Sequence, residues 1–313
     1  MDVTQSDDQD LRESMGRFQA ALTAQEPEIV EPKFDRVLLA LDGSNQDDTA
    51  TALAATLARR DEAEIALIYA HEGPRDAARE EYFTDRVAGL ERAGLRVNAT
   101  GGGDDDAAPP YERILEARRS SAAGLIVVCA PYLEDFDELG HDSVGVNLDK
   151  LMSHSPVPIL VARAPRDDAR RSFDHLITPI SPFTDEVVQA VAWAMRLADR
   201  SGLIRLVAVV DRETVDESRD LIRDFDDIDE GTLAGLRRPQ VAGLIAAAQR
   251  RANERGLHCR VSVRSGEAVE EIARLANEEN GLIASACPRK PTAAAYQRVQ
   301  ALVRASTNPV LVV

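Results

Sequence analysis

Residues 34–44 read Phe-Asp-Arg-Val-Leu-Leu-Ala-Leu-Asp-Gly-Ser, and this stretch decides the fold. A nearly continuous run of Val and Leu that stops at turn residues is typical of a buried parallel strand. A related stretch, Phe-Asp-His-Leu-Ile-Thr-Pro-Ile-Ser, occupies residues 173–181 and begins with the same Phe-Asp pair. The sequence therefore predicts two tandem copies of one domain.

Apolar strand runs alternate with helical patterns in both repeats. Strands are predicted at 36–41, 64–70, 95–99, 124–129 and 156–161, and again at 203–210, 256–263, 281–286 and 308–312. The helical patterns between them are predicted at 45–60, 72–91, around 111–115 and before 154, and at 188–195, 241–248, 268–276 and 293–303. This alternation predicts an α/β fold with a mostly parallel sheet in each repeat. Ligands bind such sheets at the carboxyl ends of the strands, which singles out Asp42-Gly43-Ser44 and the loop after Cys129.

The predicted domains are residues 33–164 and 172–313, and residues 1–32 form an N-terminal tail with a short helix. The apolar residues of that helix, between Leu11 and Leu22, lie on one helical face. The helix either packs on the first domain or joins a homodimer interface. Residues 211–239 are strongly acidic and are interpreted as a solvated excursion or a mobile helix.

Composition limits the partners and the compartment. The formal net charge of −17 argues against nucleic acid, because phosphate binding depends on Lys and Arg. An acidic, Lys-poor surface suits high salt, although an Arg-rich genome explains the same bias. No apolar run approaches the roughly 20 residues of a membrane span, and the acidic start does not resemble a signal peptide. The three cysteines form no C-x-x-C pair and are interpreted as small buried hydrophobes in a reducing compartment. We expect a cytoplasmic protein.

Three features of the first half, in this order, resemble the universal stress protein family, and the closing helix and strand recur in the second half. They are a strand ending in Asp-Gly-Ser, a strand leading into a loop, and a final helix that leads into a Pro-x-Pro-Ile-Leu-Val strand. The segment from Lys150 to Val161 (KLMSHSPVPILV) matches the closing helix and strand closely, and 308–313 (NPVLVV) matches the end again. The resemblance implies two tandem Rossmann-like domains, similar to the adenine nucleotide α-hydrolases, each with a five-stranded sheet. It also implies that the domains pair within the chain through their closing strands.

The nucleotide-binding members of this family carry a Gly-x-x-Gly-x9-Gly-Ser/Thr loop after the fourth strand, and an Asp at the end of the first strand lies beside the nucleotide. On this resemblance the candidate nucleotide-binding residues are Asp42, Gly43, Ser44, Gly140 and Gly145. The loop itself departs from the pattern: Cys129 replaces the first Gly, and Val146 stands where Ser or Thr belongs. Its five carboxylates (Glu134, Asp135, Asp137, Glu138 and Asp142) would repel phosphate.

The second repeat departs further, since Ser181-Pro182-Phe183 replaces Asp-Gly-Ser and no Gly follows Cys287. No catalytic motif and no cluster with metal spacing is evident in the sequence. Asp42 either contacts a nucleotide or caps the next helix, while Trp193 is interpreted as a core residue. We therefore expect a non-enzymatic regulatory or adaptor protein that acts through an unknown protein partner, without a cofactor or metal. The alternative is a sensor that binds ATP or AMP in the first repeat only.

Overall fold

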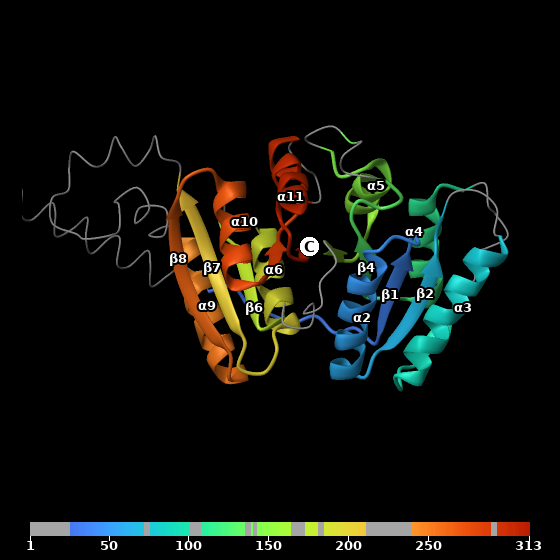
Figure 1. Cartoon of the computed structure of the whole chain (residues 1–313). Helices are drawn as coiled ribbons and strands as arrows, with labels where there is room; N and C mark the ends of the chain where they lie inside the picture. The colour runs from blue at the N-terminus through green and yellow to red at the C-terminus, as the bar shows by residue number, and fades with distance from the viewer. Residues whose placement is uncertain are drawn as a thin grey trace, which may run out of the picture.

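A computed structural model describes residues 26–71, 76–99, 108–134, 139, 143–163, 173–180, 185–210, 239–288 and 293–313. Strands and helices alternate through both halves of the chain (Figure 1). The first half contains β1 (Arg36–Leu41), α2 (Asp47–Asp61), β2 (Glu64–Tyr69), α3 (Ala77–Arg92), β3 (Val97–Ala99), α4 (Pro110–Ser121), β4 (Leu125–Cys129), α5 (Val146–His154) and β5 (Ile159–Ala162). The second half contains β6 (His175–Pro179), α6 (Asp185–Leu197), β7 (Leu203–Val210), α9 (Pro239–Arg255), β8 (His258–Ser265), α10 (Ala268–Glu279), β9 (Leu282–Ser285), α11 (Ala293–Ala305) and β10 (Val310–Val312).

The predicted α/β class and the order of elements are confirmed, with small shifts at the ends. The helix expected over 72–91 begins at Ala77, where the side chain of Asp76 accepts the N–H of Arg79 as an N-cap. The third strand is shorter than expected and begins at Val97. The predicted helix at Leu11–Leu22, the loop at 101–106 and residues 211–238 lie outside the described residues.

The ten strands of the described residues form one sheet in the order β3-β2-β1-β4-β5-β10-β9-β6-β7-β8. The pairs within each half are parallel, and the two halves meet at the antiparallel pair β5–β10, where Leu160 lies opposite Leu311. The strand order of the second half therefore repeats that of the first around a central pseudo-twofold axis. Figure 1 shows the two halves side by side, with the C-terminus at the junction.

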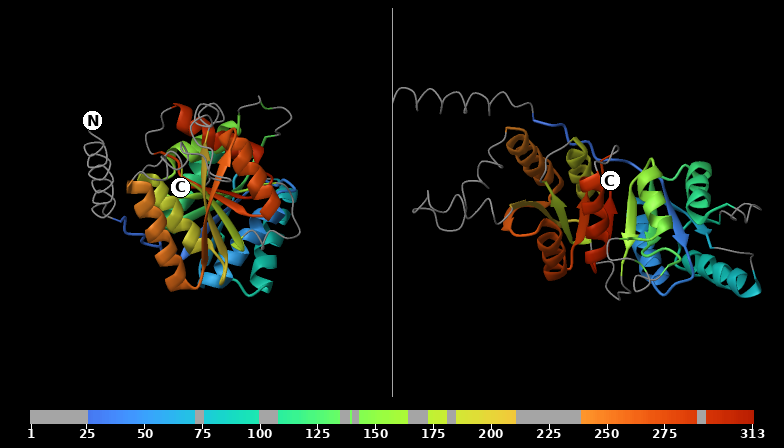
Figure 2. Two further views of the ribbon diagram at one scale, coloured as in Figure 1. Left: turned by 90° about the vertical axis from the view of Figure 1, so that its left-hand side faces the viewer. Right: turned by 90° about the horizontal axis from the view of Figure 1, so that it is seen from above.

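The helices form one layer on each face of the sheet, as the end-on and top views show (Figure 2). One core cluster contains Leu53 of α2, Phe83 of α3, Val191 of α6 and Leu244 of α9. The opposite cluster contains residues of the other four helices, α4, α5, α10 and α11. Successive strand residues alternate between the two clusters because strand side chains point to opposite faces. Within the described part of the chain, no helix has both the length and the apolar character needed to cross a bilayer.

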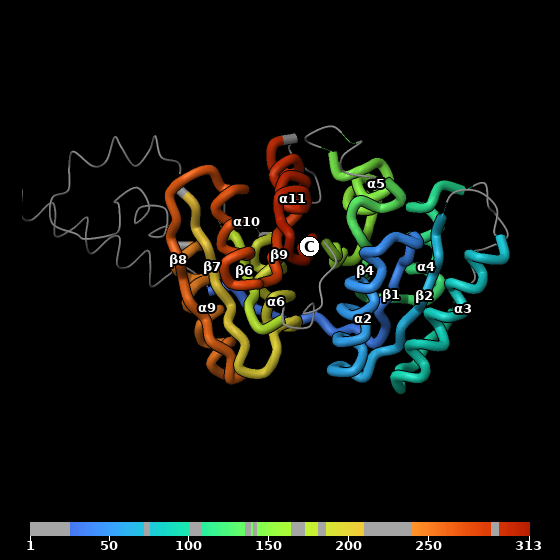
Figure 3. Tube along the Cα trace, in the orientation of Figure 1, coloured from blue at the N-terminus to red at the C-terminus, as the bar shows by residue number. Residues whose placement is uncertain are grey.

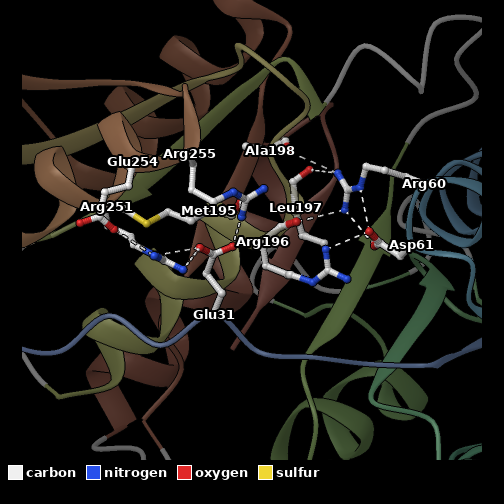
Figure 4. A network of polar contacts seen from close by, with 10 residues as sticks. All are labelled: Glu31, Arg60, Asp61, Met195, Arg196, Leu197, Ala198, Arg251, Glu254 and Arg255. Carbon is white, nitrogen blue, oxygen red and sulfur yellow. Dashed lines mark hydrogen bonds and ion pairs between the residues drawn. The ribbon is translucent and has the colours of Figure 1, made fainter.

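Helices α2 and α6 belong to different halves of the chain (Figure 3). A polar network joins their carboxyl ends (Figure 4). Arg60 donates hydrogen bonds to the carbonyls of Leu197 (2.5 Å) and Arg196 (3.1 Å), and so caps the end of α6. Asp61, whose side chain is 4% exposed, lies between the guanidinium groups of Arg60 and Arg196. A cation near the negative end of a helix is stabilising, so these charges hold the two halves together.

The segment that precedes β1 crosses the second half and adds to this junction. Glu31 forms ion pairs with Arg251 and Arg255 of α9, as Figure 4 shows. Phe34 stacks on Trp193 of α6 with ring centroids 5.8 Å apart. Trp193 is only 6% exposed, which confirms its predicted place in the core.

Candidate functional site

The carboxyl end of β1 carries two buried carboxylates, Asp42 and Asp47. Asp42 accepts the backbone N–H of Ser44 and the backbone N–H of Leu133, each at 2.9 Å. It therefore ties the turn after β1 to the loop after β4. The expectation that Asp42 caps the next helix is wrong, because its carboxylate closes the turn at Ser44 and α2 has no side-chain N-cap.

Asp47, in the first turn of α2, is fully buried and was not singled out from the sequence. Its carboxylate accepts the N–H groups of Gly43 (2.8 Å) and Asp42 (3.3 Å) and the hydroxyl of Tyr82 (2.6 Å). Burial, and then the neighbouring charge of Asp42, raise the pKa of Asp47 from 3.8 to about 7, although its hydrogen bonds act in the opposite direction. This carboxyl group therefore exchanges its proton near neutral pH.

Cys129 lies beside these two acids at the end of β4. Its sulfur accepts a hydrogen bond from the hydroxyl of Ser44 at 3.7 Å. Burial, and then the charges of Asp42 and Asp47, hold the pKa of the thiol well above 9, so it remains a poor nucleophile. The three groups present ligand atoms within 4.8 Å of one another. Every carboxylate oxygen of the pair already accepts a hydrogen bond, and the thiol holds its proton, so this donor set favours protons over a metal ion.

Tyr132 fills the space between the carboxyl ends of β1 and β2. It is fully buried, and its hydroxyl donates to the carbonyls of Leu41 (2.7 Å) and Ala70 (3.0 Å). The preceding Ala130–Pro131 peptide bond is cis. The phenol therefore lies beside the carboxyl end of β1, next to the point between β1 and β4 where the strand order reverses and where such sheets bind ligands.

The amino end of α5 is occupied by a carboxylate of the chain itself. Glu134 accepts the N–H of Val146 at 2.8 Å. Gly145 has φ +91°, and a Cβ at this position would lie 2.9 Å from the Glu134 carboxylate, so a side chain there would clash. The absence of a side chain at Gly145 thus lets Glu134, rather than an external anion, approach the helix end.

The structure brings Asp42, Gly43, Ser44 and Gly145 to one edge of the sheet, as the sequence predicts. Gly140, His141 and Asp142 lie outside the described residues, as do residues 181–184 and Arg289 and Lys290 of the second repeat. His71 is 3% exposed and packs edge-on against Tyr69, with ring centroids 4.9 Å apart. Cys129 is buried as predicted, whereas Cys259 and Cys287 are half-buried, and all three are free thiols.

Sequence reasoning missed Asp47, Tyr82 and Tyr132. Asp47 stands five residues after Asp42, in the first turn of a helix where acids are common on the surface. Tyr132 lies in a loop whose most evident feature in the sequence is its acidic residues. No local pattern distinguishes these buried polar side chains from exposed ones.

Residues 33–163 match the universal stress protein family. A comparison with curated proteins gives no match. A universal stress protein from Archaeoglobus fulgidus DSM 4304 has a similar structure, with a TM-score of 0.55 at 14% sequence identity; the match covers 88% of this chain and 95% of that protein. A universal stress protein family member from Burkholderia pseudomallei (TM-score 0.30, 20% identity) and universal stress protein UspA from Lactobacillus plantarum (TM-score 0.31, 17% identity) each match 45% of this chain and 96% and 97% of their own length. Residues 33–163 thus form a domain of the universal stress protein family, and the second half of the chain repeats its strand order.

Proposed function

We propose that this protein is a non-enzymatic regulator or adaptor that acts by associating with another protein and has lost nucleotide binding. The observation that carries the proposal is the carboxylate of Glu134 at the amino end of α5. A helix end binds anions through free N–H groups and the positive end of its dipole. The tethered carboxylate of Glu134 occupies one of these donors, the N–H of Val146, at a high effective concentration, so a phosphate must displace it and then lie close to a like charge.

Two further contacts support the loss of nucleotide binding in the first repeat. Both carboxylate oxygens of Asp42 already accept hydrogen bonds from backbone N–H groups of the chain. Tyr132 is buried between the carboxyl ends of β1 and β2, next to the crevice between β1 and β4, and two hydrogen bonds hold it there. A nucleotide that extended over β1 towards β2 would have to displace this buried aromatic side chain and leave two carbonyl groups without that donor, which is costly.

The raised pKa of the Cys129 thiol supports a non-enzymatic role, because a protonated thiol is a weak nucleophile. The three free cysteines support a reducing compartment such as the cytoplasm. The net charge of −17 favours a partner with a basic surface.

Thermal melting of the full chain with millimolar Mg-ATP or AMP tests this proposal. We expect no change in Tm for the wild type, because a ligand that binds only the folded state must raise it. In Glu134→Ala, inorganic phosphate should raise the Tm by a measurable amount, since the N–H of Val146 is then free. Glu91→Ala in α3 is the control and should behave like the wild type.

A rise of several degrees with ATP in the wild type, abolished by Asp42→Ala, would overturn the proposal in favour of a nucleotide sensor. A Glu134→Ala variant that gains no affinity for phosphate would show that Glu134 is not what blocks the helix end.

A further inference from the structure

The pseudo-twofold axis relates residues around α5 to residues around α11 one by one. In the first half, the hydroxyl of Ser155 donates to the carbonyl of Val157 (2.6 Å) and accepts its N–H (3.3 Å). In the second half, Ser306 makes the same two contacts with Asn308, both at 3.0 Å. The turn after α5 therefore corresponds to the turn after α11.

The loops that follow β4 and β9 correspond in the same way. The N–H of Ala130 donates to the carbonyl of Ala162 (3.0 Å), and the N–H of Cys287 donates to the carbonyl of Val313 (2.7 Å). The carbonyl of Cys287 is thus the counterpart of the carbonyl of Ala130. These two correspondences allow a site in one half to be compared atom by atom with its counterpart.

In the first half, this site holds the guanidinium group of Arg163, which is 9% exposed. It donates to the carbonyls of Ala130 (2.9 Å), Ser306 (2.9 Å) and Arg304 (3.1 Å). The last two carbonyls belong to the end of α11, where the helix dipole is negative. The planar guanidinium fork suits several acceptors at once.

In the second half, the corresponding space is a pocket of about 470 Å³ at the junction of the two domains. Ser153, Ser155 and Cys287, the counterparts of the three residues that bind Arg163, all line it. Glu186 of α6 adds a carboxylate, and no lysine or arginine is present among the described residues that line the pocket. The negative end of α5 and Glu186 together favour a cation.

We propose that this pocket binds a guanidinium group in the way that the first half binds Arg163. The group occupies the position between the carbonyls of Ser153, Ser155 and Cys287. Trp193 and Tyr296 line the same pocket and supply aromatic surface for the remainder of the ligand. The source of the group is a small guanidine compound or an arginine side chain of a peptide. This proposal does not depend on whether the first repeat binds a nucleotide.

The fluorescence of Trp193, the one tryptophan of the chain, reports on this pocket directly. We expect ethylguanidinium to change it with saturation, at a dissociation constant on the order of 1 mM for so small a ligand. Ethylurea, of nearly the same shape but neutral, should cause no saturable change, with sodium chloride matching the ionic strength. Calorimetry under the same conditions checks the affinity and stoichiometry.

Glu186→Gln should weaken ethylguanidinium binding about tenfold, which corresponds to about 1.4 kcal/mol. Glu270→Gln, at the first turn of α10, is the matched control and should leave the affinity unchanged. Tighter binding of an acetylated Gly-Arg-Gly amide than of ethylguanidinium would identify a peptide arginine as the source, with the citrulline peptide as its neutral control. Equal effects of ethylurea and ethylguanidinium, or no saturable change up to about 20 mM, would overturn the proposal.

Discussion

Replacing Arg163 with alanine should weaken the junction between the two halves. Arg163 follows β5 of the first domain, and two of its three acceptors, the carbonyls of Arg304 and Ser306, belong to the second. Burial, and then the charge of Arg304, lower the pKa of Arg163 to about 10, so the guanidinium remains charged at neutral pH. Its hydrogen bonds are therefore charge-assisted and join elements on both sides of the β5–β10 pair.

The expected loss follows from the three hydrogen bonds. A hydrogen bond to a charged group contributes about 1.5–3 kcal/mol, and truncation leaves its acceptors without that donor. The three hydrogen bonds share one guanidinium group, and water can enter part of the space that its removal leaves. Their contributions to stability therefore do not simply add. We expect Arg163→Ala to lower the free energy of unfolding by about 4 kcal/mol. Arg119→Ala should lower it by less than about 0.5 kcal/mol, because the side chain of Arg119 is 73% exposed and its ion pair with Glu116 lies at the surface.

Urea titrations followed by circular dichroism measure both variants. Guanidinium chloride is unsuitable, because the denaturant itself would occupy the vacated position. Ethylguanidinium should restore part of the lost stability: about 1.4 kcal/mol at ten times its dissociation constant. The wild type would gain through the pocket beside Cys287 alone, whereas Arg163→Ala would gain through two positions. A loss below about 1 kcal/mol, or an equal gain in both proteins, would refute this account of Arg163.

Two other predictions concern the end of β1. The pKa of Asp47 is about 7 in the folded chain and 3.8 in the unfolded reference, so the folded state holds more protons between these values and its stability falls as pH rises from about 4 to 7. Urea titrations at pH 5 and pH 8 should show that the free energy of unfolding falls by about 2.7 kcal/mol between them, and Asp47→Asn should largely remove this fall. The same pH dependence in both proteins would contradict the prediction. Gly43→Ala should lower the free energy of unfolding by about 1–3 kcal/mol, because Gly43 has φ +90° and a Cβ there would lie 2.7 Å from the Tyr69 hydroxyl. Gly89→Ala in α3 is the control: its Cβ meets open space, so the substitution should be neutral or stabilising. Equal effects of the two glycine substitutions would show that the close approach to Tyr69 is not limiting.

The fold could be predicted from the sequence because its evidence is local and repeated. The apolar run of β1 and the Pro-x-Pro strand of β5 each mark a buried strand without reference to distant residues. For the loop after β4, the sequence predicts that an anion is disfavoured, but not which contact disfavours it. Five carboxylates indicate repulsion of an anion, but they do not reveal that Glu134 reaches the N–H of Val146, twelve residues later. That contact depends on the path of the loop, which periodicity does not encode.

The buried polar residues could not be predicted for a related reason. Asp47 lies in the first turn of α2, where an acid is favourable on any exposed helix. Its burial follows from Tyr82, which belongs to α3 and donates to it across 35 positions of sequence. Arg163 follows β5, and its three acceptors come from the loop after β4 and from the other half of the chain. Such groups acquire their roles from tertiary contacts, and their residue types alone carry no signal.

One physical rule applies to several helices of this protein: a charged side chain of the chain itself interacts with the helix end of opposite polarity. Glu134 supplies an anion to the start of α5, Arg60 supplies a cation to the end of α6, and Arg163 supplies one to the end of α11. Each internal charge stabilises the fold and at the same time excludes an external ion from that helix end. No lysine or arginine among the described residues lines the pocket at the end of α5, although this pocket repeats the arrangement that holds Arg163. The same rule that argues against a phosphate at the start of α5 therefore argues for a guanidinium group at its end.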